Sequence, residues 1–359
     1  MPERVVLAMS GGVDSSVAAQ LLKADGYDVV GLFMRTGSHG ESEERRAKTC
    51  CSVADALDAR RVADRLDVPF YVLDFEEDFG RIQDYFADEY LAGRTPNPCV
   101  MCNIWLKFGR LWEYGKQVGA DYVATGHYAR IDRAPDGSPR VGRGRDLDKD
   151  QSYVLSGLAP ELLERIKFPI GAMAKADVRA LAKEHRLPVH DKPESQEICF
   201  VPDDDYLGFV RDRRPDRETA GTLVDEHGAV LGEHSGFEKF TIGQRRGLGV
   251  AFGEPRYVVQ IEPATKTVTV GRREALARTG LEASRFNWQG PEPEGPAPCL
   301  AQIRARHRAV PATVEPLGEG RVRVRFEVPQ PAVAPGQVVT LYQDDLVLGG
   351  GWIDRAVAD

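Results

Sequence analysis

A glycine turn directly after the first apolar run constrains the fold of this chain more than any other feature. The segment Val5–Ser16 reads "VVLAMSGGVDSS": a run typical of a buried strand stops at Ser-Gly-Gly, and a helical pattern begins one residue later. A glycine turn between a strand and a helix directs backbone N–H groups at an anion, and the helix dipole adds to the attraction. The sequence therefore predicts a phosphate-binding turn near its amino end.

The alternation of strand and helix continues through the first half of the chain. Four short apolar runs are typical of buried strands: 4–9, 29–34, 69–75 and 121–125. Four helical patterns accompany them: 13–25, 53–66, 79–91 and 104–118. Such alternation predicts an α/β fold with a parallel sheet, helices on both faces and right-handed crossovers.

The texture changes near residue 205. From Thr222 onward the apolar runs are short, β-branched and separated by glycine, which is typical of antiparallel strands. A proline-rich joint at 288–298 precedes a second β segment, which we interpret as a small barrel or sandwich. We predict three domains: an α/β catalytic domain over 1–205, a small, mostly β domain over 206–280 and a β-barrel over 281–359.

Composition restricts the setting of the protein. The chain has 359 residues, six cysteines and a formal net charge of -8. So few cysteines in so long a chain disfavour a disulfide scaffold and favour a reducing, cytoplasmic location. The chain start lacks the apolar segment of a secretory signal, and no later run approaches a membrane span.

The negative charge disfavours a generic nucleic-acid coat protein. Basic residues nevertheless gather in four stretches: 140–149, 211–217, 304–308 and 321–325. Each stretch alone is typical of a solvated face, and together they leave a nucleic-acid enzyme open.

The glycine turn differs from the commonest phosphate-binding loops. Neither G-x-x-x-x-G-K-[ST] nor G-x-G-x-x-G occurs in the chain. Without the lysine that grips the β- and γ-phosphates, transfer of the γ-phosphoryl group is disfavoured. A pyrophosphate that leaves is favoured instead, with Asp14 placed to position a magnesium ion. The simpler alternative is a capped helix start with Asp14 in its first turn.

Two more strand ends support a nucleotide site, because ligands of open α/β sheets bind beyond the carboxyl ends of the strands. Met34 ends the second strand and can lie against an adenine, although alone it is typical of a core side chain. Gly126 follows the fourth strand and allows close backbone approach.

The cysteines suggest a second chemistry. "RTPNPCVMCN" places Cys99 and Cys102 just ahead of a helix, where the pKa of a thiol can be lowered and its nucleophilicity raised. The pair also suits a redox or metal site, although a structural zinc would want a second C-x-x-C or a close histidine pair. Cys199 is the other apt cysteine. Cys50, Cys51 and Cys299 are interpreted as structural.

"SGGVDSS" resembles the PP-loop of the ATP pyrophosphatase superfamily, whose members adenylate an oxygen and release pyrophosphate. Further strings follow in order: "AGRTPNPCVMCN", "ATGHYAR", "DKDQSYVL", "ICF", "TIGQRRGLGV" and "PGQVVTLY". In combination they resemble the tRNA-specific 2-thiouridylase family over nearly the whole chain.

The resemblance implies an activity. ATP with Mg²⁺ adenylates the C2 oxygen of the wobble uridine of tRNA. Cys199, loaded as a persulfide by a sulfur-relay protein or cysteine desulfurase, delivers sulfur, and Cys102 frees it, which leaves a Cys102–Cys199 disulfide. The resemblance also implies that the barrel contacts tRNA.

The resemblance also implies site residues. Those for ATP are Ala8, Met9, Ser10, Gly11, Gly12, Val13, Asp14, Ser15, Ser16, Met34 and Gly126. Those for tRNA are Asn97, His127, Lys149, Asp150, Gln151, Arg306, His307 and Gln337.

The chain departs from the family pattern in three places. Cys99 stands where many members have aspartate. The chain therefore allows an alternative to the persulfide route, in which Cys99, Cys102 and Cys199 together bind a [4Fe-4S] cluster that carries the sulfur as sulfide. Ser195–Glu197 replaces the usual "STG", and His307 stands where tyrosine is common.

Two other functions remain open from the residues alone. One is a PP-loop ligase that adenylates a small carboxylate or carbonyl substrate, a scheme with no use for the β segments or the thiols. The other is a non-catalytic module that binds RNA or senses redox state, which leaves the glycine turn unexplained.

Overall fold

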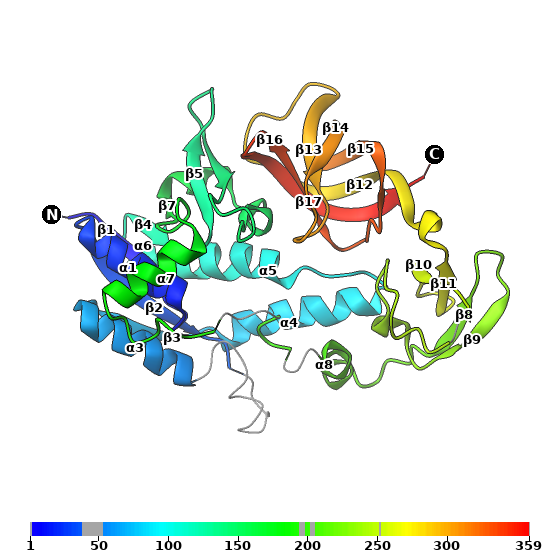
Figure 1. The fold of residues 1–359 in the computed structure, drawn as a ribbon, viewed down its shortest axis with the longest axis horizontal. Coiled ribbons are helices and arrows are strands. Elements are labelled where there is room, and N and C mark those ends of the chain that lie inside the picture. The colour runs from blue at the N-terminus through cyan, green and yellow to red at the C-terminus, as the bar shows by residue number, and fades with distance from the viewer. Residues whose placement is uncertain (1, 38–52, 194–197, 202–204, 251–252, 359) are drawn as a thin grey trace. The chain divides into compact units, whose positions relative to one another are not determined.

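The computed structural model describes residues 2–37, 53–193, 198–201, 205–250 and 253–358 (Figure 1). The chain forms two compact units. The first comprises Met1–Ile82, Cys99–Asp204 and Asp345–Leu348, and the second comprises Gln83–Pro98, Asp205–Asp344 and Gly349–Asp359. Within the described residues, none of the helices combines the length and apolar character that a membrane crossing requires.

The first unit is built on a five-stranded sheet in which every pair is parallel. The strands are β1 Arg4–Ala8, β2 Asp28–Arg35, β3 Phe70–Asp74, β4 Tyr122–Ala124 and β7 Ile166–Lys167. Their order is β3-β2-β1-β4-β7, so the strand order reverses at β1, which is where α/β sheets bind their ligands. The predicted parallel sheet is confirmed, and the bounds of its first four strands differ from prediction by at most one residue.

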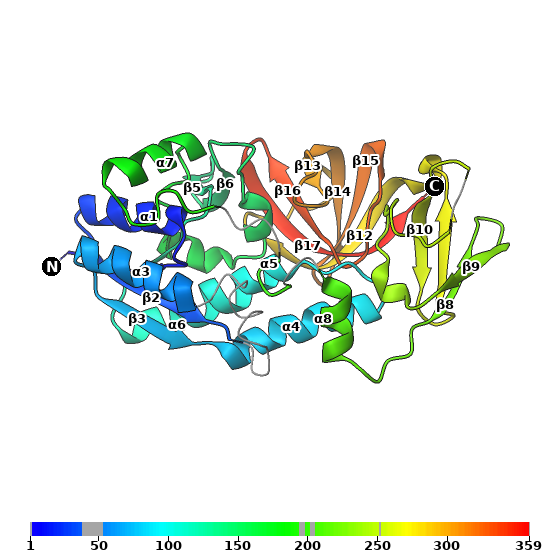
Figure 2. The same ribbon diagram turned by 60° about the horizontal axis from the view of Figure 1, so that its bottom comes forward.

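Helices cover both faces of this sheet, as predicted (Figure 2). They include α1 Val13–Ala24, α3 Val53–Leu66, α6 Leu111–Gln117 and α7 Lys175–Glu184, while α4 Glu76–Leu91 runs on into the second unit. Val5 and Leu7 of β1 are buried in a core shared with α1, α3 and α7. Val6 points to the other face, where a Cβ on Gly115 of α6 would lie 2.8 Å from its Cγ2.

The helix predicted over 104–118 exists, but it begins as a π-helix. Helix α5, Pro98–Met101, leads into a π-helix over Cys102–Arg110, and α6 follows. The wider turn brings Gly109 over Ile104, five residues earlier, so that a Cβ on Gly109 would lie 2.8 Å from the Ile104 carbonyl oxygen. Periodicity of an ordinary helix does not reveal such a turn, which is rare and frequent at functional sites.

A β-hairpin and two 3-10 helices follow β4, and the sequence did not predict them. The elements are β5 Ala129–Arg133, β6 Pro139–Arg143, η2 Ser152–Leu155 and η3 Pro160–Arg165. Asn103 of the π-helix donates from Nδ2 to the Val154 carbonyl at 2.9 Å and so fixes the π-helix against η2.

The second unit contains a four-stranded sheet in the order β10-β11-β8-β9. Its strands and helices are α8 Tyr206–Arg213, β8 Gly221–Val224, β9 Val230–His234, η5 Phe237–Lys239, β10 Tyr257–Glu262, β11 Thr267–Gly271 and η6 Arg273–Leu276. The prediction of an antiparallel sheet is wrong for one pair, because β8 and β11 run parallel. Short alternating strands show the same pattern of faces in either direction, so their texture does not reveal the partner's direction.

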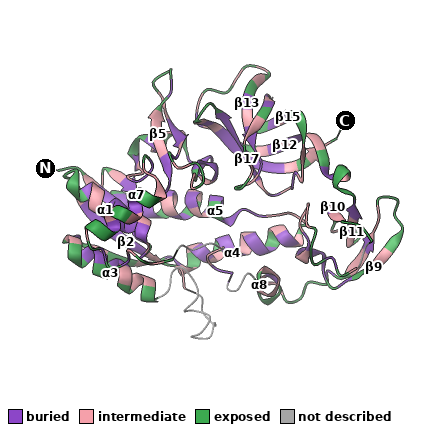
Figure 3. Ribbon diagram, viewed as in Figure 1, coloured by how far each residue is buried: buried purple, intermediate pink, exposed green. Residues whose placement is uncertain are grey.

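The remaining strands close into a six-stranded barrel, which confirms the predicted barrel. They are β12 Ala277–Trp288, β13 Ala297–Gln302, β14 Val310–Gly318, β15 Arg321–Pro331, β16 Val338–Gln343 and β17 Leu346–Val357. The pairing of β12 with β17 completes the ring. Buried residues alternate with more exposed ones along part of β14 and β15 (Figure 3), as for Ala312 and Val314 of β14, whereas β16 is buried over most of its length. The division at residues 205 and 280 stays a prediction.

Candidate active site

Backbone geometry at the glycine turn keeps the amino end of α1 open. Gly11 has a φ of +73°, and a Cβ there would lie 2.2 Å from the Asp55 carbonyl oxygen. Gly12 is the N-cap of α1, and no side chain of the described residues caps it. Ser15 and Ser16 donate from Oγ to the Gly12 carbonyl at 3.2 and 2.7 Å. The serine hydroxyls therefore brace the turn, and the first-turn N–H groups are left to an anion.

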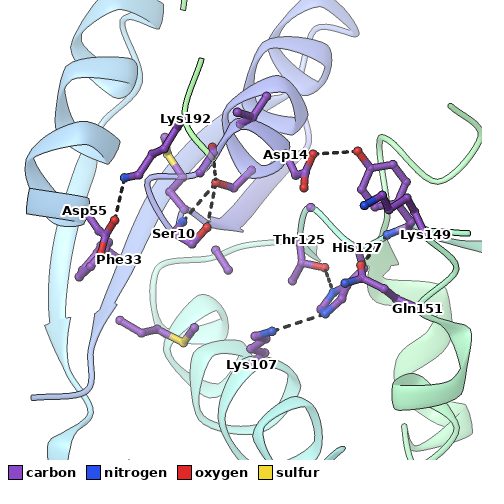
Figure 4. A pocket seen from close by; sticks show the side chains of 18 of the residues that line it. Ser10, Asp14, Phe33, Asp55, Lys107, Thr125, His127, Lys149, Gln151 and Lys192 are labelled. Atoms are coloured by element: carbon purple, nitrogen blue, oxygen red, sulfur yellow. Dashed lines mark hydrogen bonds and ion pairs between the residues drawn. The ribbon is translucent and has the colours of Figure 1, made fainter. Parts of the chain in front are cut away.

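A cavity of about 390 Å³ lies where β1, β2 and β4 end (Figure 4), a volume within the usual range for small-molecule sites. Most residues that the sequence assigned to ATP line it: Ala8, Met9, Ser10, Gly12, Val13, Asp14, Ser15, Met34 and Gly126. Gly11 and Ser16 do not line it. Gly126 packs so closely that a Cβ would lie 2.8 Å from the Ser15 backbone nitrogen. The backbone approach expected of Gly126 is thus to α1, although its contact with a nucleotide stays a prediction.

Asp14 meets two donors on the cavity wall. Lys175 Nζ lies 2.8 Å from each of its carboxylate oxygens, and the Tyr128 hydroxyl donates to Oδ1 at 2.8 Å. Lys175 begins α7, and its side chain is only 12% exposed. A lysine 161 positions away thus reaches the loop that has no lysine of its own.

A second lysine lies on the other side of the turn. Lys192 Nζ donates to the Gly11 carbonyl at 3.1 Å and to Asp55 and Asp58 at 2.7 Å each. Burial opposes its charge, but the hydrogen bonds to the two carboxylates outweigh burial, and the pKa of Lys192 is raised. Sequence reasoning missed Lys175 and Lys192, because neither lies in a motif and one sequence does not show contacts over such separations.

His127 is a buried, neutral member of the cavity wall. Burial lowers its pKa well below the ordinary 6.5, and the charge of Lys107 lowers it further. Lys107 Nζ lies 3.4 Å from His127 Nε2, and Thr125 Oγ1 lies 2.6 Å from Nδ1. Since an ammonium only donates, we assign Nε2 as the acceptor and Nδ1–H as the donor to Thr125. The contact of His127 with tRNA stays a prediction.

The stretch 149–151 divides between the cavity and the fold. Lys149 and Gln151 line the cavity, and Gln151 Oε1 accepts from the Tyr128 backbone N–H at 2.9 Å. Asp150 is instead held by Arg143 at 2.9 Å and by the Ser152 hydroxyl at 2.9 Å. With a side chain only 6% exposed, Asp150 has a structural role in this arrangement, whatever its predicted role in tRNA binding.

Three cysteines of the first unit lie on two segments. Cys99 lies on α5 and Cys102 at the start of the π-helix, while Cys199 lies beside Phe200, whose ring packs edge-on against Phe79 with centroids 5.5 Å apart. No disulfide joins the described cysteines. Cys99 keeps exposed surface, yet crowding around its thiol raises its pKa, and Lys107 only partly offsets this. The lowered pKa expected of a thiol here is therefore wrong for Cys99.

The other cysteines agree with a structural interpretation where the structure describes them. Cys299 is buried in β13, and burial raises its pKa to about 12. Cys50, Cys51 and Ser195–Glu197 lie outside the described residues.

The metal sites expected from the sequence differ in how the residues fit them. Among the described residues, no three of His, Cys, Asp or Glu are grouped so that they could hold a metal ion. Cys99, Cys102 and Cys199 thus do not form a ligand set for a cluster in this arrangement. Magnesium needs only one or two carboxylates besides phosphate oxygens and water, and Asp14 on the cavity wall fits that requirement.

Known proteins match this chain over nearly its whole length. Three family models match in succession: the tRNA methyl transferase HUP domain over 3–203, the tRNA methyl transferase PRC-barrel domain over 208–272 and the aminomethyltransferase β-barrel domain over 278–353. The tRNA-specific 2-thiouridylase MnmA of Geotalea uraniireducens is 50% identical over 99% of this chain and 96% of its own length. The proteins of that name from Geobacter metallireducens and Clostridium perfringens are each 48% identical, over 99% and 98% of this chain and 98% of their own lengths.

This chain belongs to the tRNA-specific 2-thiouridylase family. The family, the fold class and the enzyme class predicted from the sequence are thereby confirmed.

The other residues that the 2-thiouridylase resemblance assigned to tRNA lie in the second unit. Asn97 is buried and follows an irregular segment, in which the carbonyls of Thr95 and Pro96 accept from Gln337 Nε2 at 3.2 and 3.0 Å. Arg306 is exposed, whereas His307 lies 3.2 Å from Gln330 through Nε2 and Oε1. Burial lowers the pKa of His307, and the charge of Arg304 also lowers it, although the hydrogen bond with Gln330 opposes this. Contacts of these residues with tRNA stay predictions.

Proposed function

We propose that this protein transfers sulfur to C2 of the wobble uridine of tRNA in an ATP-dependent reaction, in the cytoplasm and with a sulfur-relay protein or cysteine desulfurase as donor. The observation that carries the proposal is that one compact unit contains both the glycine-turn cavity and the thiols Cys102 and Cys199. Identity of 50% to a protein named tRNA-specific 2-thiouridylase supports the same activity.

The residues of the cavity suit a nucleotide that loses pyrophosphate. The first-turn N–H groups of α1 would face the phosphates, and Lys175 and Lys192 would add the positive charge that the loop lacks. Met34, with Phe33 beside it on the wall, offers an apolar surface for the adenine. Asp14 would hold Mg²⁺ against the phosphates. When bound, ATP supplies the adenylyl group that makes the C2 oxygen of uridine a leaving group.

Cys199 and Cys102 would divide the sulfur chemistry between them. Cys199 carries the sulfur as a persulfide, whose terminal sulfur bonds to C2 as the C2–O bond breaks and AMP departs with the oxygen. The Cys102 thiolate then attacks Cys199 Sγ, and the persulfide S–S bond breaks. Sulfur stays on C2 as the thiocarbonyl, and the Cys102–Cys199 disulfide is reduced by an external dithiol.

Mass spectrometry of tRNA nucleosides tests the proposal directly. Incubation of the protein with tRNA, ATP and a sulfide or persulfide source should yield 2-thiouridine, and omission of ATP should erase it. Cys199→Ala should abolish the product, whereas Cys299→Ala, a cysteine of the barrel, should retain it. Thiouridine formed at the wild-type rate by Cys199→Ala would refute the assignment.

Cys99 separates the persulfide route from a cluster route. With a raised pKa and no part in the persulfide steps, Cys99 should be dispensable, so Cys99→Ser should keep at least half of the activity. A cluster on three cysteines would lose a ligand. Iron bound to anaerobically purified wild-type protein, with loss of both iron and thiolation in Cys99→Ser, would contradict the persulfide route.

A further inference from the structure

Several arginines in the basic stretches of the second unit are paired with carboxylates of the protein. The pairs are joined at 2.8–3.0 Å: Arg211 with Glu238, Arg213 with Asp84, Arg214 with Asp88 and Arg323 with Glu282. In the same stretches Arg217, Arg321 and Arg325 are exposed and make no ion pair with a described residue. In such a pair the carboxylate occupies some of the five N–H donors of the guanidinium and offsets its charge. The paired arginines of 211–217 and 321–325 are therefore weaker candidates for contact with a polyanion than arginines without a carboxylate partner.

The loop "GQRRG" at 243–247 is different. Arg245 and Arg246 are both exposed, and neither side chain makes a hydrogen bond or an ion pair with any residue in the described ranges. Glu254, the carboxylate that follows them in the chain, is already bound by Arg256 at 2.7 Å and by Arg272 at 3.1 Å. Two adjacent guanidinium groups thus face solvent without a neutralising partner among these residues.

The loop is also well fixed, which an incidental surface loop need not be. The Gly243 N–H donates to the Val258 carbonyl at 2.8 Å, and the Val258 N–H donates to the Gln244 carbonyl at 2.9 Å. Gln244 Nε2 closes the turn on the Arg246 carbonyl at 2.9 Å. On the far side, Leu248 is buried in the core of the four-stranded sheet. These bonds hold the backbone that carries Arg245 and Arg246, so less backbone entropy is lost when the two arginines bind a ligand.

The loop adjoins the segment that holds the other exposed basic loop of this unit. A Cβ on Gly243, whose φ is +88°, would lie 2.6 Å from Ala332 Cβ. The preceding residue, Pro331, accepts a hydrogen bond from Arg304 at 3.3 Å. Arg304 opens the stretch 304–308, in which Arg306 is exposed and makes no ion pair with a described residue. The loops 243–247 and 304–308 therefore border one segment, 330–332.

We infer that Arg245 and Arg246 bind the phosphate backbone of the RNA substrate and extend its contact surface from the barrel onto the four-stranded sheet. Guanidinium groups match phosphate oxygens with two parallel hydrogen bonds. Because the chain carries a net charge of -8, unpaired local cations have to supply the attraction for a polyanion. That the polyanion is tRNA rests on the proposed function.

Salt-dependent tRNA binding tests the inference. Arg245→Gln, Arg246→Gln and the double variant are compared with wild type by fluorescence anisotropy of labelled tRNA from 0.05 to 0.3 M KCl. Each lost phosphate contact should reduce the slope of log affinity against log salt by roughly 0.7–0.9, so the double variant should lose about 1.5. Its Kd should rise roughly tenfold near 0.1 M salt. Arg272→Gln is the matched control, because Arg272 is exposed directly after β11 of the same sheet but is paired with Glu254.

The outcomes separate the inference from the function on which it rests. Wild-type affinity and slope in the double variant, with tRNA binding by wild type intact, would overturn the inference alone. An equal loss in Arg272→Gln would also overturn it, since the effect would then be general charge. Failure of the wild-type protein to bind tRNA would overturn both. If a thermal melt shows that the double variant folds poorly, the two single variants test the same inference. Each should reduce the slope of log affinity against log salt by half as much.

Discussion

Replacement of Lys175 by methionine should separate two roles of the lysine in the cavity. Lys175 Nζ donates to both carboxylate oxygens of Asp14 at 2.8 Å. On the proposed function it also supplies positive charge to the phosphates. Removal of the ammonium should therefore release Asp14 for a metal ion and, at the same time, weaken the reaction.

The two effects have opposite signs and different sizes. Asp14 is 32% exposed, and pairs near the surface are worth about 1 kcal/mol or less, so the released carboxylate should bind Mg²⁺ up to about fivefold more tightly. Loss of a charged donor aimed at a developing negative charge costs about 3 kcal/mol, or roughly 100-fold in rate. Tighter metal binding with slower chemistry is thus the expected signature of Lys175→Met.

Two measurements read these effects separately. ATP–pyrophosphate exchange in the presence of tRNA gives the rate, and electron paramagnetic resonance of Mn²⁺ gives metal affinity without turnover. Lys183→Met is the control, because Lys183 lies on the same helix but is exposed. A slower rate with unchanged or weaker metal binding would show that Lys175 only supports the fold, and an unchanged rate would refute its role with the phosphates.

Two further substitutions test the cavity wall. Gly126→Ala places a Cβ 2.8 Å from the Ser15 nitrogen, so α1 must shift, and the ATP affinity measured by calorimetry should fall at least tenfold. Gly295→Ala is the control, because a Cβ there has no atom within 4 Å, and it should leave the ATP affinity unchanged. The pKa of His127 is lowered in the folded state, so the unfolded chain takes up a proton first and stability falls as pH drops below about 6.5, by up to about 1.4 kcal/mol per pH unit. Urea unfolding from pH 7.5 to 5 should show a shallower decline for His127→Gln, and equal declines would contradict the buried, neutral imidazole.

The parts of the fold that follow from local pattern were predictable. The strand β1, the turn at Gly11 and Gly12 and the helix α1 are consecutive in the chain, and their burial pattern and backbone requirements are written in adjacent residues. The π-helix that begins at Cys102 was not predictable. Over only nine residues, the spacing of apolar residues does not distinguish a π-helix, whose hydrogen bonds join residues five apart, from an α-helix, whose hydrogen bonds join residues four apart. The parallel pairing of β8 with β11 was missed for a similar reason. The residue pattern of each strand indicates neither which strand it pairs with nor in which direction that strand runs.

The candidate site was predictable only where a motif carried it. Asp14 and Gly126 could be placed from strand ends and a glycine turn. Lys175 and Lys192 could not, since each is a single lysine whose partners lie 161 and 137 positions away. The exposed state of Arg245 was likewise unpredictable, because a basic stretch looks the same whether carboxylates neutralise it, as at Arg213, or not.

Lys175 and Lys192 also explain how the glycine turn can bind phosphates although it contains no lysine. A lysine built into the loop would stay beside the phosphates through the whole reaction. Lys175 and Lys192 instead have carboxylate partners in the protein, Asp14 for one and Asp55 with Asp58 for the other. When pyrophosphate leaves, neither ammonium is stranded in a half-buried cavity, because each returns to its carboxylates, and the cost of an unpaired buried charge is avoided. On the proposed function, positive charge that binds the leaving group and then lets it go is what an adenylating site requires, and paired lysines from outside the loop supply it.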